Sequence, residues 1–347
     1  MPENTKNTKN RGQFRVGTVV KRFLLLVLET LLILVTGVYG VIFLLSKGPS
    51  SSAKELFVHS VNETSAIGFL SRICLSDEEV DSILANANAE EEAVQMDTSL
   101  FSDAAAAEDD IWATKDEDGD GIILEEVKGR SYSGYMMIVK DPKRVQVVIN
   151  KDQFLYKGKT VEEYCKMYDA VACINGGGFE DANGQGNGEA PDSMVVVEGE
   201  IYAPWGGTHN GFVGIDADGI LHVDCQSTQA IKDAGIQYGC AYGPILVENG
   251  DYSPNLRDDG TGINPRTAVG QRADKSILLL VIDGRHVSSL GATYNDLADI
   301  MLDYGAINAG NMDGGSSTLM YYNGEYVNNK AAVIGIRPIP SAWIVTK

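Results

Sequence analysis

The longest run of apolar residues in the chain spans positions 23–45. It contains one charged residue, Glu29, in 23 positions. A helix of this length, at about 1.5 Å per residue, crosses a hydrocarbon core of roughly 30 Å. Six basic residues precede the run and only Lys47 follows it closely; the positive-inside rule places such an amino terminus in the cytoplasm. The pattern predicts a basic cytoplasmic tail over residues 1–22, a single transmembrane helix over residues 23–45, and an extracellular remainder.

A cleaved signal peptide is the alternative to this anchor. Its apolar core is usually about 7–15 residues long and is followed by a small-residue cleavage site. The run here is longer, and the residues after it, Ser46 to Ser50, lack a clear cleavage pattern. The sequence therefore favours an uncleaved anchor in the cell membrane.

Residues 46–110 have the composition of a stalk. A Ser/Gly/Pro stretch precedes acidic, Ala-rich sequence that has few apolar residues to bury. Ser76 and Glu79 have the spacing of a capping box, which predicts a short helix over about residues 77–86. We expect the rest of the stalk to be a helical or loosely ordered spacer.

From about residue 111 the pattern changes to β-branched runs separated by glycine-containing turns. Strands are predicted at 136–139, 145–149, 170–174, 194–197 and 277–282, and helices at 161–169 and after Thr293. The run 277–282 has no polar position, which is typical of a central strand buried on both faces. Asn249-Gly250 and Asn323-Gly324 predict hairpins. The sequence predicts an α+β domain over residues 111–347, with a mixed, largely antiparallel β-sheet and a few packed helices.

Charge is divided unevenly between the anchor and the domain. The chain has 28 basic and 48 acidic residues, for a net charge of −20. Residues 1–50 hold seven of the basic and two of the acidic residues, so the remainder has a net charge of −25. Nucleic-acid binding requires a basic surface, and this composition excludes it as a function of the body.

The sequence contains two patterns that resemble metal sites, and five cysteines. Asp116, Asp118 and Asp120 match the first half of a calcium loop, but Val127 replaces the bidentate Glu at its twelfth position, which favours an acidic turn. The four histidines form no H-x-x-H pair, which argues against a zinc hydrolase. The five cysteines are compatible with one or two extracellular disulfides or with buried free thiols. They lie at positions 74, 165, 173, 225 and 240.

A glycine-rich segment, Asn175–Gly188, directly follows a predicted strand. It contains six glycines in fourteen positions. Glycines let the backbone approach a ligand closely and present N–H groups to an anion. No Gly-Lys-Ser/Thr follows, so the segment is not a nucleotide-binding P-loop. A plain flexible loop is the alternative.

Three further segments place charged groups beside turns. Arg266 lies between a proline turn and a strand, where it can contact a phosphate with two N–H groups. Asp283 and Arg285 follow the apolar strand 277–282. Asp313 is followed by two glycines and two serines, which suits a carboxylate for acid/base chemistry or nucleophilic attack. Surface ion pairs and turn-capping carboxylates are the alternatives for these segments.

In order and spacing, these segments resemble the phosphodiester glycosidase family. The matching pieces are Ile174–Phe179, Tyr242–Val247, Pro265–Gly270, Asp283–Arg285, Gly291–Thr293 and Asn311–Ser317. The resemblance covers roughly residues 170–345. Met312 replaces a usual Leu and Ser316 a common third Gly, so the loop differs in shape while its carboxylate is retained.

The resemblance implies hydrolysis of a sugar-1-phosphodiester, such as an N-acetylglucosamine-1-phospho-linked glycan. Arg266 and the backbone of residues 175–178 would hold the phosphate, Asp313 would act as base or nucleophile, and Glu180 is a weaker candidate acid. Asp283 and Arg285 would orient the sugar or a bound cation. No cofactor is firmly implied, although a divalent cation shared by Asp283 and Asp313 stays open. The residues expected to bind the substrate are Asn175, Gly176, Gly177, Gly178, Arg285, Asn311, Gly314, Gly315, Ser316 and Ser317.

Two other function classes fit the same sequence. One is a non-catalytic cell-envelope module that binds a glycan. The other is a membrane-anchored transferase of phospho-linked glycopolymers in exopolysaccharide or cell-wall synthesis. Turnover of a phosphodiester separates a hydrolase from the module, and product analysis with a sugar acceptor separates it from the transferase.

Overall fold

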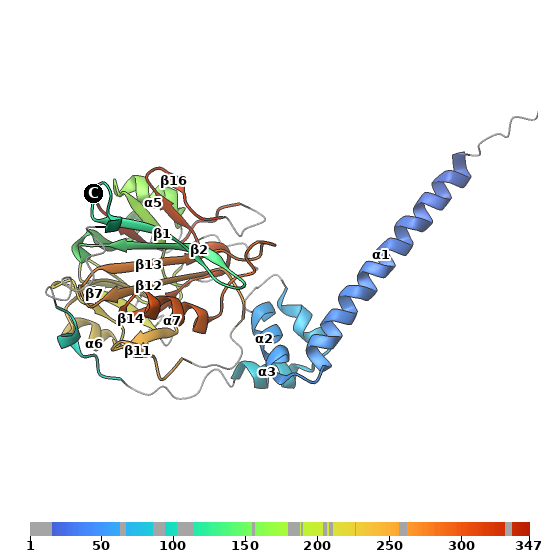
Figure 1. The fold of residues 1–347 in the computed structure, drawn as a ribbon, viewed down its shortest axis with the longest axis horizontal. Coiled ribbons are helices and arrows are strands. Elements are labelled where there is room, and N and C mark those ends of the chain that lie inside the picture. The colour runs from blue at the N-terminus through green and yellow to red at the C-terminus, as the bar shows by residue number, and fades with distance from the viewer. Residues whose placement is uncertain are drawn as a thin grey trace, which may run out of the picture.

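The computed structural model describes residues 16–62, 67–85, 94–102, 114–154, 157–179, 188, 190–203, 207, 211–225, 227–256, 262–329 and 335–347. A long helix, α1 (Val16–Lys47), projects away from a body built on β-sheets, and a small group of helices lies at its foot (Figure 1). Over Val20–Lys47 this helix is long and apolar enough to cross a membrane, with a mean hydropathy of 2.3. The structure therefore has a helix where the sequence predicts the span.

The predicted stalk is helical in much of its described part, as one of the two alternatives expected. Helices α2 (Ser51–Asn62), η1 (Gly68–Ile73) and α3 (Asp77–Ala85) pack together, whereas η2 (Thr98–Leu100) lies against the body, where Asp97 N donates to Asn249 Oδ1 (2.8 Å). Val58, Leu75 and Val80 form a small core of their own. The predicted capping box of α3 is present: Glu79 N donates to Ser76 Oγ (3.2 Å), and Ser76 N donates to Glu79 Oε2 (3.0 Å).

The described part of the body consists of three antiparallel sheets. The first has the order β1-β2-β13-β12-β14-β10-β11, the second β16-β15-β4-β17-β3 and the third β6-β5-β9-β7-β8. The strands of the first sheet are β1 (Ile122–Lys128), β2 (Ser133–Val139), β10 (Ile245–Glu248), β11 (Asp251–Tyr252), β12 (Arg266–Arg272), β13 (Ile277–Ile282) and β14 (Ala306–Met312). Those of the second are β3 (Val145–Ile149), β4 (Ala172–Asn175), β15 (Met320–Tyr322), β16 (Glu325–Tyr326) and β17 (Ser341–Val345). Those of the third are β5 (Val195–Val197), β6 (Glu200–Tyr202), β7 (Phe212–Asp216), β8 (Leu221–His222) and β9 (Ile236–Ala241).

One central core joins the three sheets, and each sheet has a helix on its outer face. The helices are α7 (Tyr294–Asp303) on the first sheet, α5 (Val161–Met167) on the second and α6 (Thr228–Asp233) on the third. The alternation along β13 illustrates the arrangement: Ile277, Leu279 and Val281 face the central core, and the residues between them face α7. The prediction of a strand buried on both faces is confirmed, since all six residues of β13 are buried.

The predicted turns and caps are also present. Asn249-Gly250 joins β10 to β11, Asn323-Gly324 joins β15 to β16, and these four residues have positive φ. Thr293 caps α7 in a reciprocal box with Asp296. The predicted α+β class, with antiparallel sheets and a few helices, is confirmed. All five cysteines are free thiols, so none of the disulfides left open by the sequence is formed.

Candidate active site

Asn175, the last residue of β4, joins two sheets at the centre of the candidate site. Its side chain is fully buried, and its Nδ2 donates to the backbone oxygen of Asp313 (2.6 Å). Its Oδ1 accepts from Thr267 Oγ1 (2.8 Å) and from Leu319 N (3.3 Å). Asn175 therefore fixes the backbone that carries Asp313, rather than presenting its side chain to a substrate.

The three glycines after Asn175 have a packing role. Their N–H groups donate to the oxygen of Ser341, to Ser341 Oγ (3.2 Å) and to the oxygen of Ala241 (3.4 Å), in chain order. A Cβ on Gly177 would lie 2.5 Å from the backbone oxygen of Ala241, so a larger residue there would displace a strand. All three N–H groups donate within the protein in this structure, and their contact with a phosphate stays a prediction.

Asp313 follows β14 and has an incompletely bonded carboxylate. Its side chain is 13% exposed, and Oδ2 is buried without a hydrogen-bond partner. The guanidinium of Arg337 lies close, with Nη2 3.9 Å from that oxygen. Arg337 also donates to Ser317 Oγ from Nη2 (2.8 Å) and Nε (3.2 Å), and it lies over the ring of Phe179 at 5.0 Å. The result is a carboxylate beside a positioned cation.

Burial raises the pKa of Asp313 to about 6, because a charged carboxylate loses its hydration there. Arg337 and a hydrogen bond from Ser317 oppose this rise, whereas the nearby charge of Asp192 adds to it. Asp192 is positioned by a backbone bond from its N to the oxygen of Gly178 (3.3 Å). Two carboxylates and one guanidinium thus meet at this site, and raised carboxyl pKa values are common where acid/base chemistry occurs.

Arg266 does not have the contacts expected of a phosphate-binding residue. It is 3% exposed, and it donates to the backbone oxygens of Ala292 (3.2 Å) and Gly262 (2.5 Å). Its guanidinium lies 4.1 Å from the centre of the Tyr294 ring. These contacts join three segments of the chain and give Arg266 a structural role, whereas its contact with a phosphate stays a prediction.

Asp283 is likewise engaged within the fold. Its Oδ1 accepts from Asn328 Nδ2 (3.1 Å) and Asn329 N (3.0 Å), and its Oδ2 accepts from Asn329 Nδ2 (2.8 Å). Asn328 in turn binds the backbone of Thr318 and Met320. Asp283 therefore holds the segment after β16 against the loop after Asp313, and both of its oxygens are occupied.

Most of the remaining predicted residues lie in or beside the loop after Asp313, and Asn311 lies in the interior. Gly314, Gly315, Ser316 and Ser317 lie in the loop and short helix η8 (Gly315–Ser317) directly after Asp313. Arg285 stands beside this loop, with its guanidinium 3.2 Å from where a Cβ of Gly315 would lie. Asn311 instead faces the interior, where it donates from Nδ2 to the oxygen of Gly243 (2.7 Å).

Two sequence predictions concern acidic residues elsewhere. Glu180, the candidate acid, lies outside the described residues. Asp116, Asp118 and Asp120 accept hydrogen bonds from backbone N–H groups of their own turn, and β1 begins directly afterwards at Ile122. The favoured acidic turn agrees with this geometry.

Arg337 and Asp192 are the site residues that sequence reasoning missed. Arg337 lies in a proline-flanked segment near the carboxyl terminus, and Asp192 follows the glycine-rich segment. Only tertiary pairing brings them to Asp313, since an isolated β-bridge joins Phe179 to Pro191 and thereby places Asp192. The Arg-Pro dipeptide and the Pro-Asp-Ser turn were the local signals available.

Comparison with known proteins finds relatives that are similar to about half of this chain. A Bacillus subtilis prophage-derived uncharacterized protein, YomE, is 28% identical over 182 residues, which are 49% of this chain and 27% of that protein. The N-acetylglucosamine-1-phosphodiester alpha-N-acetylglucosaminidase of Bos taurus is also 28% identical over 182 residues, covering 48% of this chain and 33% of the relative. The chain thus spans about a third or less of the length of these relatives.

A solved structure shares the fold. The catalytic domain of zebrafish N-acetylglucosamine-1-phosphodiester alpha-N-acetylglucosaminidase, auto-inhibited by its pro-peptide, aligns with a TM-score of 0.52 and 22% identity, over 65% of this chain and 82% of that one. The family model described as phosphodiester glycosidase matches residues 168–346, slightly more than half of the chain. This region contains Asn175, Asp192, Asp313 and Arg337, and the chain belongs to the phosphodiester glycosidase family.

Proposed function

We propose that this chain is a hydrolase that cleaves sugar-1-phosphodiesters, releasing the sugar and leaving a phosphomonoester. The observation that carries the proposal is the carboxylate of Asp313, with a raised pKa and an unpartnered Oδ2 3.9 Å from Arg337. Carboxylates with one unpartnered oxygen are costly to bury, so retaining one beside a cation suits a reacting group.

The proposed reaction breaks the bond between the sugar C1 and the phosphate oxygen. Water supplies the new C1 hydroxyl, and its other proton is taken up by the departing phosphomonoester or by solvent. Asp313 stabilises the oxocarbenium-like centre, either as a base toward water or as a nucleophile. A phosphomonoester is a good leaving group, so a positioned cation suffices for its developing charge.

Arg337 is the cation that we assign to this phosphate, in place of Arg266. Its contacts with Ser317 and with the ring of Phe179 hold the guanidinium in a fixed orientation beside Asp313. A preorganised guanidinium can contact two phosphate oxygens at once, which a lysine cannot do. Asp192 tunes the site by raising the pKa of Asp313.

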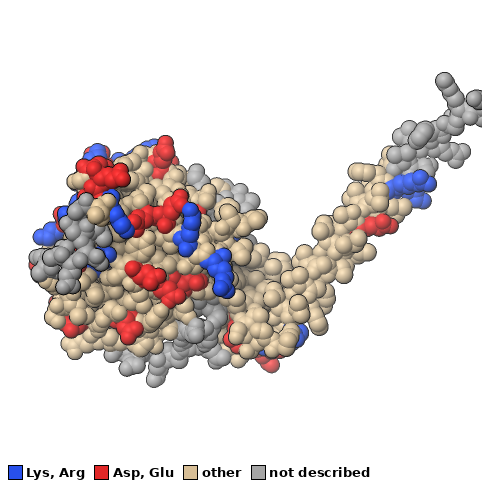
Figure 2. All heavy atoms as spheres, viewed as in Figure 1, with Lys and Arg blue, Asp and Glu red and all other residues tan. Residues whose placement is uncertain are grey.

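The substrate proposed first is an N-acetylglucosamine-1-phosphodiester, because named relatives of this chain act on that group. For location, we propose that residues 23–45 anchor the chain in the cell membrane, with residues 1–22 in the cytoplasm. Residues 46–110 then form an extracellular stalk, and residues 111–347 the catalytic domain in the cell envelope. The length and hydropathy of α1 support this topology, as do the basic side chains at its outer end (Figure 2).

The decisive test is turnover by the full chain in detergent. Wild-type protein and the Asp313→Asn variant are incubated with an N-acetylglucosamine-1-phosphodiester, and free sugar and phosphomonoester are quantified. Wild type should release both in equal amounts, and Asp313→Asn should release neither above background. Binding without turnover by wild type would favour the glycan-binding module, and transfer to an added sugar acceptor would favour the transferase.

A further inference from the structure

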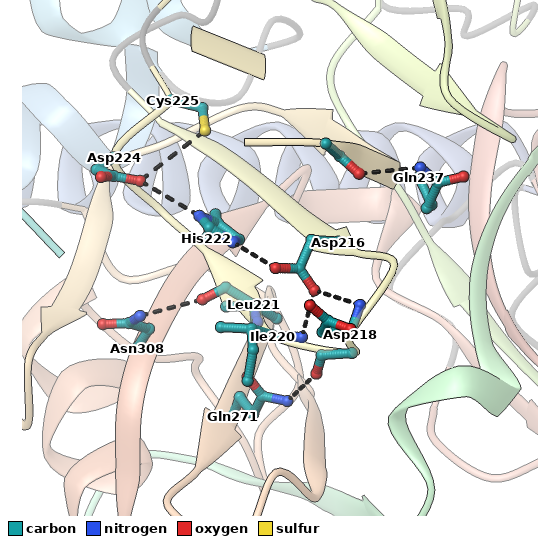
Figure 3. A network of polar contacts seen from close by, with 12 residues as sticks. Asp216, Asp218, Ile220, Leu221, His222, Asp224, Cys225, Gln237, Gln271 and Asn308 are labelled. Atoms are coloured by element: carbon teal, nitrogen blue, oxygen red, sulfur yellow. Dashed lines mark hydrogen bonds and ion pairs between the residues drawn. The ribbon is translucent and has the colours of Figure 1, made fainter. Parts of the chain in front are cut away.

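A second cluster of reactive side chains lies on the third sheet, away from Asp313. His222, Asp224 and Cys225 each offer a ligand atom, and these atoms lie within 4.8 Å of one another. His222 ends β8, and Asp224 and Cys225 follow it after Val223. Figure 3 shows the imidazole between Asp216 and Asp224, with Cys225 beside Asp224. None of these residues takes part in the proposed hydrolysis.

The distances within the cluster match a small coordination sphere. His222 Nδ1 lies 3.8 Å from Asp224 Oδ1, and Cys225 Sγ lies 3.9 Å from the same oxygen. A tetrahedral ion about 2.0–2.3 Å from each donor would separate the donors by roughly 3.3–3.7 Å. The third pair, His222 Nδ1 and Cys225 Sγ, lies within 4.8 Å, so shifts of up to about 1 Å would bring the three atoms onto one ion.

Asp216 provides the independent observation that points to a ligand at His222. Its Oδ2 lies 3.0 Å from His222 Nε2, on the side of the ring away from Asp224 and Cys225 (Figure 3). A carboxylate in this position can accept a proton held on Nε2, and binding of a metal in exchange for the proton on Nδ1 would direct that nitrogen's lone pair toward the other two donors. Metal-binding histidines almost always have such a partner on their second nitrogen.

We propose that Nδ1 of His222, the carboxylate of Asp224 and the thiolate of Cys225 bind one divalent transition-metal ion, with zinc as the best match. A set of one nitrogen, one oxygen and one sulfur donor suits Zn²⁺ and disfavours Mg²⁺ and Ca²⁺, which take oxygen ligands. The side chain of Asp224 is 30% exposed, whereas Cys225 is buried. A water on the exposed side would complete four-coordination.

The ion would fix the segment 222–225, which lies beside a junction between two sheets. The backbone of Leu221, next to His222, accepts from Asn308 Nδ2 (3.0 Å) and donates to Gln271 Oε1 (2.7 Å), both on the first sheet. Asn308 and Asp313 are five residues apart along β14, which is roughly 16 Å in a strand. The proposed role is therefore structural and separate from the site at Asp313.

Cobalt provides a spectroscopic test on the full chain in detergent. Metal-free protein is titrated with Co²⁺ at pH 8, where ligand protons are displaced more readily, and the near-ultraviolet band of a cobalt–thiolate bond is recorded. One equivalent should saturate this band in wild type. Cys225→Ser should abolish the band, and the matched control Cys165→Ser, at a buried cysteine outside the cluster, should retain it. Asp216→Asn should weaken binding about 10–100-fold.

Thermal unfolding with Zn²⁺ gives a second readout that does not depend on the thiol band. At a hundred times its Kd, Zn²⁺ should raise the Tm of wild type by roughly 5–10 °C and leave Cys225→Ser and His222→Asn unchanged. Circular dichroism checks that each variant is folded. A folded wild type with neither band nor Tm shift up to 1 mM metal would overturn the proposal and leave the cluster as an ion pair. Loss of the band in Cys165→Ser would also overturn it.

Discussion

Asp283 and Asp313 occupy equivalent places in the first sheet, yet their surroundings differ. Their strands, β13 and β14, lie on either side of β12 and run parallel to each other. The carboxyl ends of both strands, and so both residues, therefore lie at the same end of the sheet. Both oxygens of Asp283 accept hydrogen bonds from Asn328 or Asn329. Oδ2 of Asp313 has no such partner.

The two arginines differ in a similar way. Arg266 is buried and donates to two backbone oxygens, whereas Arg337 is partly exposed and contacts side chains of the candidate site. Sequence motifs contain both aspartates and Arg266 but cannot separate a group that holds the fold from one that meets a substrate. The hydrogen bonds separate them, because a fully bonded polar group has little capacity left for a ligand.

The largest effect is expected for Asp313→Asn. Loss of this carboxylate should lower kcat at least about 10³-fold, as for other removed catalytic groups, and should change the free energy of unfolding by no more than about 1–2 kcal/mol. Initial rates and urea unfolding measure the two quantities. The control is Asp169→Asn, at a side chain that is 83% exposed. Full activity of Asp313→Asn would remove Asp313 from the mechanism.

The pair Arg337→Gln and Arg266→Gln tests the assignment of the two arginines. Arg337→Gln should lower kcat/KM about 10²–10³-fold, since it removes one charged contact to the developing phosphate. Arg266→Gln should instead lower the free energy of unfolding by about 1–3 kcal/mol, because two backbone oxygens lose their donor. The reverse result, with catalysis lost only in Arg266→Gln, would restore the prediction made from the sequence.

The pH dependence of kcat should report the raised pKa of Asp313. With a pKa of about 6, the deprotonated fraction, and with it kcat, should fall about tenfold per pH unit below pH 6. The nearby charge of Asp192 raises this pKa, so Asp192→Asn should move the inflection to lower pH; Arg337 lowers it, so Arg337→Gln should move the inflection to higher pH. A profile that is flat between pH 4 and 7 would contradict the role of Asp313 as base or nucleophile.

Asp283→Asn should act on stability and spare catalysis. The substituted amide places donors against Asn329, which should lower the free energy of unfolding by about 1–3 kcal/mol. Turnover per folded molecule should stay within about twofold of wild type, measured well below the midpoint of unfolding. A large loss of kcat in a variant of normal stability would return Asp283 to the catalytic residues.

The smallest effect is expected from salt. The chain outside residues 1–50 has a net charge of −25, and acidic side chains are spread over the visible face of the body (Figure 2). Such a body repels a phosphodiester at long range, and salt screens that repulsion. Raising ionic strength from low values should lower KM a few-fold; a rise in KM would mean that the positive charge of Arg337 dominates the approach.

Much of the fold follows from local patterns. The run 277–282, the Asn-Gly turns and the capping box of Thr293 each depend on nearby residues, and the structure confirms them. The stalk was harder to predict, since its core is formed by three residues from two helices and the segment between them. A segment with so few apolar residues resembles a spacer in composition, although those few residues form a core in the structure.

The candidate site could be located from sequence only in part. The sequence makes Asp313 a candidate because glycines and hydroxyls follow it. Its partner Arg337 approaches through contacts with Phe179, more than 150 positions earlier in the chain. The glycines after Asn175 suggest an anion site by composition, but whether their N–H groups face a ligand depends on acceptors in two other strands.

Through the side chain of Asn175, the position of Asp313 depends on how the first and second sheets pack against each other. This side chain connects β4, in the second sheet, to Thr267 and the Asp313 backbone, which belong to the first. Sliding of one sheet against the other would displace Asp313 before either sheet lost its own ladder. Because the two ends of this link are more than 130 positions apart in the chain, no short contiguous fragment can retain the site.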